Sequence, residues 1–355
     1  MRNILLAVTL TLCFLNADAQ NDFKKLDAWV ADNAEQMGGR AILMVYKDGH
    51  IIYSHAENKM TARQKMAGRF IARRQNKTAD FSDFTPTTRI PVASCSKWYS
   101  AALVMTFVDE GKLKLTDTVG KYLPALSKSG KGNITIGECL SHETGIKSPE
   151  LKESLKEMRN IGSMDEAIAD IAAMPMEGEP GKTFHYSNTG LQIAGAILEK
   201  ISGKSFQTLF AERIAKPLNM QNSNFGDSKV ALPAGGAYST PNDYMNFLVM
   251  ILNKGTFNGK RILSEKSIDE MQINRIKPYV KIAYSPTQIA IPGYGYGEWI
   301  MGDGIVSSPG LFGSFPWVNK DKYYAAFLMT FYLNNSGKQE RYKELWSLVN
   351  EFVSN

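Results

Sequence analysis

The first apolar segments of the chain are two short runs separated by a polar turn. The runs cover residues 42–46 and 51–53, and Asp48-Gly49 lies between them. An Asp-Gly pair between apolar runs is a strong hairpin signal, because both turn residues tolerate positive φ. The pattern therefore predicts an N-terminal β-hairpin, whereas the polar and basic stretch 57–86 that follows indicates no particular element.

Helical spacing prevails in the middle of the chain. Leu191, Ala194 and Ile197 recur every three or four residues, so they share one helix face. Ser163 and Glu166 have the spacing of a capping box, which is typical of a helix start. Helices are expected over residues 97–110, 167–174, 189–201, 243–252 and 264–271.

Strand-like runs return toward the C-terminus and are followed by one more amphipathic helix. The runs cover 294–301, 312–318 and 323–332, and the helix carries Tyr342, Leu345, Trp346, Val349 and Phe352. A hairpin first, helices in the middle and a meander last predict an α+β fold with an antiparallel sheet built from both chain ends. We expect a mainly helical subdomain at roughly 112–240.

Residues 1–19 have the pattern of a secretory signal peptide. Arg2 gives a positive start, residues 4–15 are apolar, and Ala17-Asp18-Ala19 is an A-x-A cleavage site. About 12 apolar residues fall short of the ~20 that span a bilayer. Lipidation at Cys13 is an alternative, although Leu12 is large for that motif. The prediction is an exported protein, periplasmic or secreted, with one large domain over 20–355 and no stable membrane span.

Charge and cysteine usage narrow the possible partners. The formal net charge is +6 and mostly scattered, so no nucleic-acid partner is expected; one basic cluster, Arg63 to Lys77, is interpreted as a solvated helix face or loop. Beyond the leader only Cys95 and Cys139 remain, and Cys95, among apolar neighbours, is expected to be a buried free thiol. The histidines lack metal-ligand spacing, so neither a metal nor a cofactor is predicted.

Ser94-Cys95-Ser96-Lys97 is the motif with the clearest chemistry. Three residues are just under one helical turn, so Ser94 and Lys97 project from the same side. One interpretation is a helix-capping serine followed by a surface lysine. The other is a nucleophile and its base, which requires burial to lower the pKa of the lysine. The helix pattern after the motif, 98–105, is apolar nearly all round, which indicates a buried helix and favours the second interpretation.

Tyr186-Ser187-Asn188 precedes another predicted helix and also has two interpretations. Asn188 could simply cap that helix. Alternatively, the Tyr186 phenol passes protons to and from Ser94, while Asn188 holds the lysine and the substrate in place.

These motifs, in this order, resemble the serine β-lactamase-like family, which includes class C β-lactamases, D-alanyl-D-alanine carboxypeptidases, D-aminopeptidases and related esterases. Similar stretches in the family order are 87–97, 134–146 (TI-x-x-LL-x-H-x-SG), 180–190 (PG…YSN-x-G), 216–220 (KPLGM) and 235–243 (GG-x-x-ST-x-x-D). The resemblance implies that Ser94 is acylated, that Lys97 and Tyr186 are the acid-base groups, and that Asn188 orients substrate and lysine. It also implies a structural role for His142 and half of an oxyanion hole from the Ser94 N–H.

The third motif of that family departs from the pattern here. Its counterpart is Ser308-Pro309-Gly310, where family members have K-T-G or H-x-G. The resemblance implies a substrate-binding role for Ser308 and Gly310, with the Leu311 N–H as the second oxyanion donor. Ser308 brings no charge, and a charge-assisted hydrogen bond is roughly twice as strong as a neutral one. A neutral ester or amide, or a carboxylate held by another cation, is therefore favoured.

The sequence thus predicts an exported serine hydrolase that cleaves an ester or amide through a Ser94 acyl-enzyme. A D-Ala carboxypeptidase or β-lactamase proper is the narrower alternative. A cell-envelope binding protein of the same fold with little turnover is the alternative from another class. The expected partner is a small-molecule or peptidoglycan-derived ester or amide, and the sequence indicates no oligomeric state.

Overall fold

The computed structural model describes residues 23–74, 76–149, 161–286 and 293–354. The predicted signal peptide, residues 1–19, lies outside these ranges. No helix within them has the length and apolar character required to cross a bilayer.

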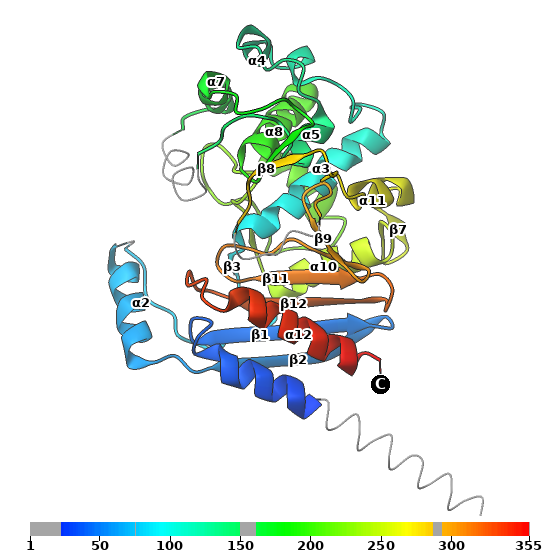
Figure 1. Cartoon of the computed structure of the whole chain (residues 1–355). Helices are drawn as coiled ribbons and strands as arrows, with labels where there is room; N and C mark the ends of the chain where they lie inside the picture. Colours follow the sequence, from blue (N-terminus) through cyan, green and yellow to red (C-terminus); the bar gives the residue numbers. More distant parts are fainter. Residues whose placement is uncertain (1–22, 75, 150–160, 287–292, 355) are drawn as a thin grey trace, which may run out of the picture.

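A six-stranded antiparallel sheet is built from both ends of the chain (Figure 1), in the order β2-β1-β12-β11-β10-β9. The strands are β1 (Arg40–Lys47), β2 (His50–Asn58), β9 (Trp299–Gly302), β10 (Ile305–Ser307), β11 (Phe315–Asn319) and β12 (Tyr324–Thr330). The N-terminal strand β1 lies beside the C-terminal strand β12, with Leu43 opposite Leu328. This arrangement confirms the α+β fold and the sheet built from both chain ends.

Alternating side chains on these strands supply two separate cores. On β12, Phe327 and Met329 face the core that contains the central helices. Their neighbours Ala326 and Leu328 face a second core, formed with the helix at residues 23–34 and with α12 (Lys338–Phe352). A strand that is covered on both faces is apolar throughout, and every residue of β12 is buried.

The remaining helices lie on the side of the sheet opposite α12 (Figure 1), apart from α2 at one flank. α10 lies next to the sheet, and α4, α5, α7 and α8 gather on the far side of α3 from the sheet. The bounds are α2 (Ala62–Arg74), α3 (Ser96–Asp109), α4 (Pro124–Lys128), α5 (Ile136–Leu140), α7 (Met164–Ala173), α8 (Thr189–Ser202), α9 (Phe206–Phe210), α10 (Pro241–Leu252) and α11 (Glu265–Met271), with short turns η1 (Ala93–Cys95), η2 (Val119–Lys121) and a π-helical turn η4 (Ala211–Ala215).

Three two-stranded ladders complete the described secondary structure. They are β3 (Ile90–Pro91) with β5 (Tyr238–Ser239), β4 (Thr183–His185) with β8 (Lys281–Tyr284), and β6 (Thr256–Phe257) with β7 (Lys260–Arg261). The first two ladders are next to Ser94 and Tyr186 in the sequence, so they position the two residues that the sequence pattern singles out.

The predicted hairpin, the expected helices and the final helix are confirmed within a few residues, but two local predictions are wrong. The run 294–301 is a strand only from Trp299, and β10 forms a separate strand after the Gly302–Gly304 turn. At α7, Ser163 caps the helix, but the Glu166 carboxylate accepts from the Gly162 N–H, so only half of the capping box forms. The expected buried thiol at Cys95 is confirmed, and Cys139 is also buried and free.

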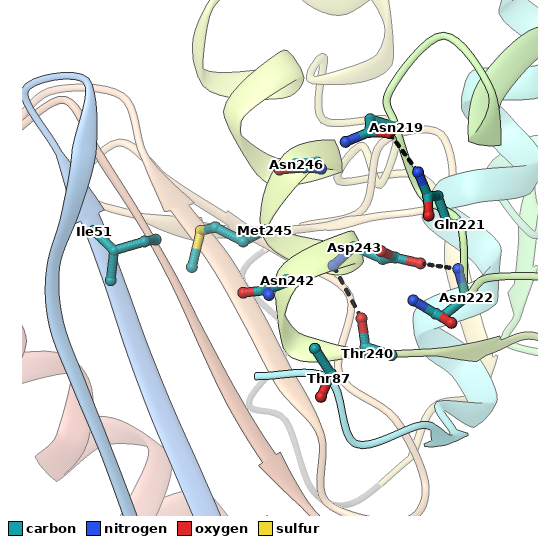
Figure 2. A pocket seen from close by; sticks show the side chains of 10 residues that line it. All are labelled: Ile51, Thr87, Asn219, Gln221, Asn222, Thr240, Asn242, Asp243, Met245 and Asn246. Atoms are coloured by element: carbon teal, nitrogen blue, oxygen red, sulfur yellow. Dashed lines mark hydrogen bonds between the residues drawn. The ribbon is translucent and has the colours of Figure 1, made fainter. Parts of the chain in front are cut away.

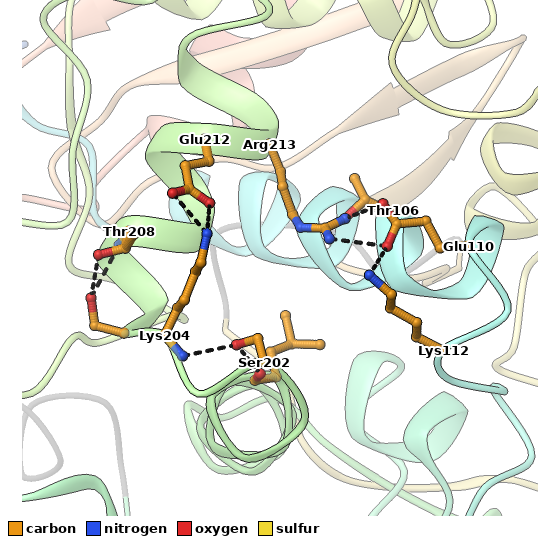
Figure 3. Close-up of polar contacts among 10 residues, drawn as sticks. Thr106, Glu110, Lys112, Ser202, Lys204, Thr208, Glu212 and Arg213 are labelled. Carbon is orange, nitrogen blue, oxygen red and sulfur yellow. Dashed lines mark hydrogen bonds and ion pairs between the residues drawn. The ribbon is translucent and has the colours of Figure 1, made fainter.

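Salt bridges tie the far end of α3 to the π-helical turn (Figure 3). Arg213 donates to both carboxylate oxygens of Glu110, at 2.8 and 3.0 Å, and Lys112 pairs with the same carboxylate. The pKa of Glu110 falls to about 2, chiefly because of the hydrogen bond from Arg213. This end of the helix is exposed to water, in contrast to its other end.

Candidate active site

Ser94 lies in a tight turn between an extended segment and a buried helix. β3 pairs with β5, the Val92 N–H donates to the Ala237 carbonyl at 2.9 Å, and the turn η1 then leads into α3. Ala93 has φ +47°, a conformation that costs a residue with a Cβ about 1–2 kcal/mol. The Tyr244 hydroxyl donates to the Cys95 carbonyl at 2.9 Å. The backbone around Ser94 is therefore held on both sides in a strained geometry.

Lys97 is fully buried one turn along the same helix and points back at Ser94. Its Nζ lies 3.2 Å from Ser94 Oγ. It donates to the Ala234 carbonyl at 2.8 Å and lies 3.4 Å from Asn188 Oδ1. Burial lowers the pKa of Lys97 to about 7. No carboxylate forms an ion pair with it in the part of the chain that the structure describes.

The neighbours of Lys97 match a neutral amine. An uncharged amine has two N–H donors and one lone pair. The Ala234 carbonyl and Asn188 Oδ1 are two acceptors, and the third polar neighbour is the Ser94 hydroxyl, which can accept from an ammonium or donate to a neutral amine. These three partners match the two N–H donors and the lone pair of a neutral lysine when the serine hydroxyl donates.

Tyr186 approaches the same pair from the end of β4. Its N–H donates to the Tyr284 carbonyl at 3.0 Å, and the nearby Ser94 side chain partly opposes the rise in the pKa of its phenol. Lys97 Nζ lies 4.7 Å from the centre of its ring. Trp299 stacks on the ring at 5.3 Å between centroids. Burial raises the pKa of Tyr186 well above its usual range, so the phenol keeps its proton at neutral pH.

Asn188 does not make the side-chain cap that the simpler interpretation of its motif predicts. It occupies the N-cap position of α8, but its side chain makes no capping hydrogen bond. Its Oδ1 faces Lys97 instead. The helix start fixes the backbone of Asn188, and the buried side chain lies against the lysine.

His142 packs against the Tyr186 ring. Its ring is 4.6 Å from the Tyr186 ring, and its Nε2 lies 3.1 Å from the Tyr294 hydroxyl. Burial, followed by the nearby charge of Lys97, lowers its pKa well below the usual value. The neutral ring packs against the tyrosine, and the structural role expected for His142 stays a prediction.

The third motif lies beside the nucleophile, but Ser308 is not directed at a substrate. Its hydroxyl, 1% exposed, is shared between the Ser94 carbonyl at 3.2 Å and the Gly297 carbonyl at 3.0 Å. A Cβ on Gly310 would lie 2.4 Å from the Val92 carbonyl oxygen, so only glycine allows this close approach. Substrate binding by Ser308 and Gly310 stays a prediction, and the geometry gives both a packing role.

Leu311 follows at the edge of the site. Within the described ranges, neither its backbone N–H nor that of Ser94 donates to a protein acceptor. Two such N–H groups are what an oxyanion hole requires. The Leu311 carbonyl accepts from the Lys338 ammonium at 3.1 Å. Lys338, at the start of α12, therefore fixes the segment from the far side.

Several residues that the sequence pattern did not single out complete the arrangement. Ala234 contributes its backbone carbonyl, and the neighbouring Gly235-Gly236 pair is the sequence feature that could have pointed to it. Gly297, at φ +76°, lies so close to α3 that a Cβ would be 2.5 Å from the Lys97 carbonyl oxygen. Trp299 and Tyr294 enclose the Tyr186 ring, but neither has a recognisable motif.

The ST-x-x-D stretch has a structural role in a separate pocket of about 320 Å³ (Figure 2). Thr240 caps α10 by accepting from the Asp243 N–H. The Asp243 carboxylate accepts from the Asn222 N–H at 2.7 Å and from the Ser223 hydroxyl at 2.9 Å. This aspartate holds the loop at 219–224 and is not part of the Ser94 cluster.

The chain belongs to the beta-lactamase family, whose sequence profile matches residues 26–350. Among curated relatives, the uncharacterized protein MT1414 of Mycobacterium tuberculosis is 25% identical over 241 residues, which are 53% of this chain and 60% of that protein. Protein flp of Staphylococcus aureus is 27% identical over 144 residues, 40% of this chain and 29% of flp. The chain thus matches 60% or less of these relatives' own length.

Solved structures share the fold over nearly the whole chain. A Bacteroides dorei beta-lactamase candidate superposes with a TM-score of 0.77 at 26% identity, over 94% of this chain and 99% of that one. The hydrolase EstCE1, with promiscuous acyltransferase activity, superposes at 0.72 with 18% identity, over 93% and 99% of the two chains. The octameric penicillin-binding protein homologue of Pyrococcus abyssi gives 0.71 at 22% identity, over 92% and 77%. The protein therefore has the fold of the beta-lactamase-type serine hydrolases.

Proposed function

We propose that the protein is a serine hydrolase that cleaves an ester or amide through an acyl-enzyme on Ser94. The observation that carries this proposal is the buried lysine at 3.2 Å from the serine hydroxyl, with a pKa of about 7 and with two oxygen acceptors as its other hydrogen-bond partners. A serine is a weak nucleophile until a base takes its proton. A base with a pKa near the working pH is the most effective.

In the acylation step, Lys97 takes the Ser94 proton while Oγ attacks the substrate carbonyl carbon. The N–H groups of Ser94 and Leu311 stabilise the oxyanion. The leaving group departs with a proton from Tyr186, whose phenol is protonated at neutral pH, and the lysine proton then returns to the phenolate. Water attacks the acyl-enzyme by the reverse route, so no net proton is gained or lost by the enzyme.

The favoured substrate is a neutral ester or amide. Ser308 directs its only proton at two backbone carbonyls, so this motif offers no cation to a substrate carboxylate. The similarity to a hydrolase with promiscuous acyltransferase activity supports acyl transfer as the reaction class. The A-x-A pattern at residues 17–19 supports export, and we propose that the enzyme works in the periplasm or outside the cell.

A fluorophosphonate probe tests the proposal directly, with intact mass as the readout. The wild type should gain one phosphonyl group with loss of fluoride, Ser94→Ala should gain none, and Ser100→Ala, which removes another buried hydroxyl of α3, should react as the wild type does. The labelling rate should rise with pH through about 7 and then level off, because only the neutral lysine accepts a proton. An unlabelled, folded wild type would contradict the proposal and favour a binding protein of the same fold.

A further inference from the structure

The helix α2 contributes nothing to either core. None of its residues is buried, and it stands at one flank of the molecule with one side toward the body (Figure 1). Gln64, Gly68 and Ala72 form the less exposed side, and Gly68 lies against the Phe81 ring. The opposite side of the helix faces solvent along its whole length.

That outer side carries large apolar side chains that are exposed to water. Met66 is 66% exposed and Phe70 is 58% exposed, and a spacing of four residues places them one above the other. Ile71, at 55%, lies toward a groove of about 440 Å³ between α2 and the end of β12. Phe331 and Leu333, both exposed, line the other wall of this groove. The result is an apolar ridge beside an apolar groove.

The ridge is flanked by positive charge on both sides. α2 contains Arg63, Lys65, Arg69, Arg73 and Arg74 and has no acidic residue. At about 100° per residue, Arg63 and Arg74 lie on one side of the Met66–Phe70 ridge, and Arg69 and Arg73 lie on the other. None of these five cations forms an ion pair with another described residue. Their contacts are with aromatic rings, Arg69 with Phe81 and Arg74 with Phe70.

We propose that this face of α2 docks the protein on an anionic lipid bilayer. A helix with an apolar strip flanked by arginines lies in the bilayer interface, where the strip enters the acyl boundary and the cations meet lipid phosphates. A soluble polyanion would use the arginines but would give Met66 and Phe70 no partner. A second copy docked through the same face would place five cations against five, which opposes that pairing.

Vesicle co-sedimentation of the full chain tests the proposal. The protein should bind phosphatidylcholine vesicles that contain about one third phosphatidylglycerol at least about tenfold more tightly than pure phosphatidylcholine vesicles. Binding should weaken in 0.5 M NaCl, since salt screens charge at an exposed surface. Equal binding to both vesicle types, or no binding to either, would overturn the proposal.

Three variants separate the two parts of the face. The R69Q/R73Q/R74Q variant should bind anionic vesicles about 100-fold more weakly, because each cation near the bilayer surface contributes roughly tenfold or less to the affinity. The M66S/F70S variant should lose about tenfold or more, because the apolar strip no longer enters the bilayer. K128Q/K229Q/K266Q removes three exposed charges elsewhere and should change binding by less than about threefold.

Each contrary result has a defined meaning. An equal loss in the control triple would show general charge attraction and refute a docking face. A loss in the arginine triple without a loss in M66S/F70S would assign the face to a soluble polyanion and refute the bilayer. A dimer in light scattering that M66S/F70S dissociates would assign the face to a second copy. All variants should keep the wild-type unfolding temperature and probe labelling, so misfolding is detected separately.

Discussion

Positive charge has opposite surroundings at the two ends of helix α3. At the start, Lys97 is fully buried, and the neighbours of its amine are a hydroxyl, an amide oxygen and a carbonyl. At the far end, Lys112 and Arg213 share the Glu110 carboxylate in a solvent-exposed cluster. Burial without a counter-charge lowers the pKa of Lys97 to about 7, whereas the hydrogen bond from Arg213 lowers the pKa of the Glu110 carboxyl to about 2.

The difference shows that a lysine buried at the start of α3 and a lysine exposed just past its end experience opposite surroundings. A buried ammonium with no counter-ion costs several kcal/mol, which the protein avoids when the lysine loses its proton. An exposed pair costs little and contributes little. The chemistry proposed at Ser94 thus requires that Lys97 lack an acidic partner such as the one at the other end of α3.

Loss of the amine at the buried end should have the largest effect on activity. Lys97→Met keeps the length of the buried side chain but provides no base, so we expect the fluorophosphonate labelling rate of Ser94 to fall by about 10²–10⁴. The measurement is the second-order labelling rate at pH 8. Lys112→Met, which removes a lysine at the exposed end, should label at the wild-type rate. Similar rates in Lys97→Met and the wild type would remove Lys97 as the base.

The sequence predicts the parts of the fold and site that depend on local spacing. The β1-β2 hairpin, helix α8 and helix α12 follow from turn residues and periodicity. α2 could not be predicted, because its apolar residues lie on the solvent side together with its arginines and form no core-facing period. β10 was missed because three residues after a turn are too short to show alternation.

In the site, the same limit separates Lys97 from the groups that complete its surroundings. Ser94 and Lys97 lie within one turn, so their proximity follows from helix geometry. Ala234 lies 137 residues away and acts through a carbonyl that every residue type has. The orientation of the Ser308 hydroxyl depends on where Gly297 places its carbonyl, and no pattern of residue types records that.

The second effect concerns stability, and its sign follows from the lowered pKa of Lys97. The pKa of Lys97 is about 10.5 in the unfolded chain and about 7 in the folded protein. Between these values the unfolded state binds more protons, so stability rises with pH in that window. The free-energy cost of burying Lys97 is therefore fully present below pH 7 and decreases toward pH 10.5. Lys97→Met removes this dependence.

We therefore expect Lys97→Met to gain stability relative to the wild type as pH falls from about 9.5 to about 7, by on the order of 1–3 kcal/mol. Urea unfolding at the two pH values gives the difference directly. Comparing the difference between pH values cancels the constant cost of leaving the Ala234 carbonyl without its donor. A wild type and variant with parallel pH dependence would contradict a lowered pKa at Lys97.

The smallest effect is expected at the exposed end, from Glu110→Gln. The pKa of Glu110 is lowered to about 2, so its stabilising contribution is present above about pH 4.5 and is lost as pH falls toward 2. Because the side chain is 42% exposed, solvent screening limits the loss at pH 7 to less than about 1 kcal/mol. Urea unfolding in low salt should show this loss, and 1 M NaCl should reduce it.

Glu212→Gln is the matched control for this prediction. It breaks the ion pair with Lys204 at another exposed carboxylate (Figure 3). A Glu110→Gln loss of several kcal/mol that persists in high salt would mean that this end of α3 is shielded from water, and the contrast between the two ends would fail.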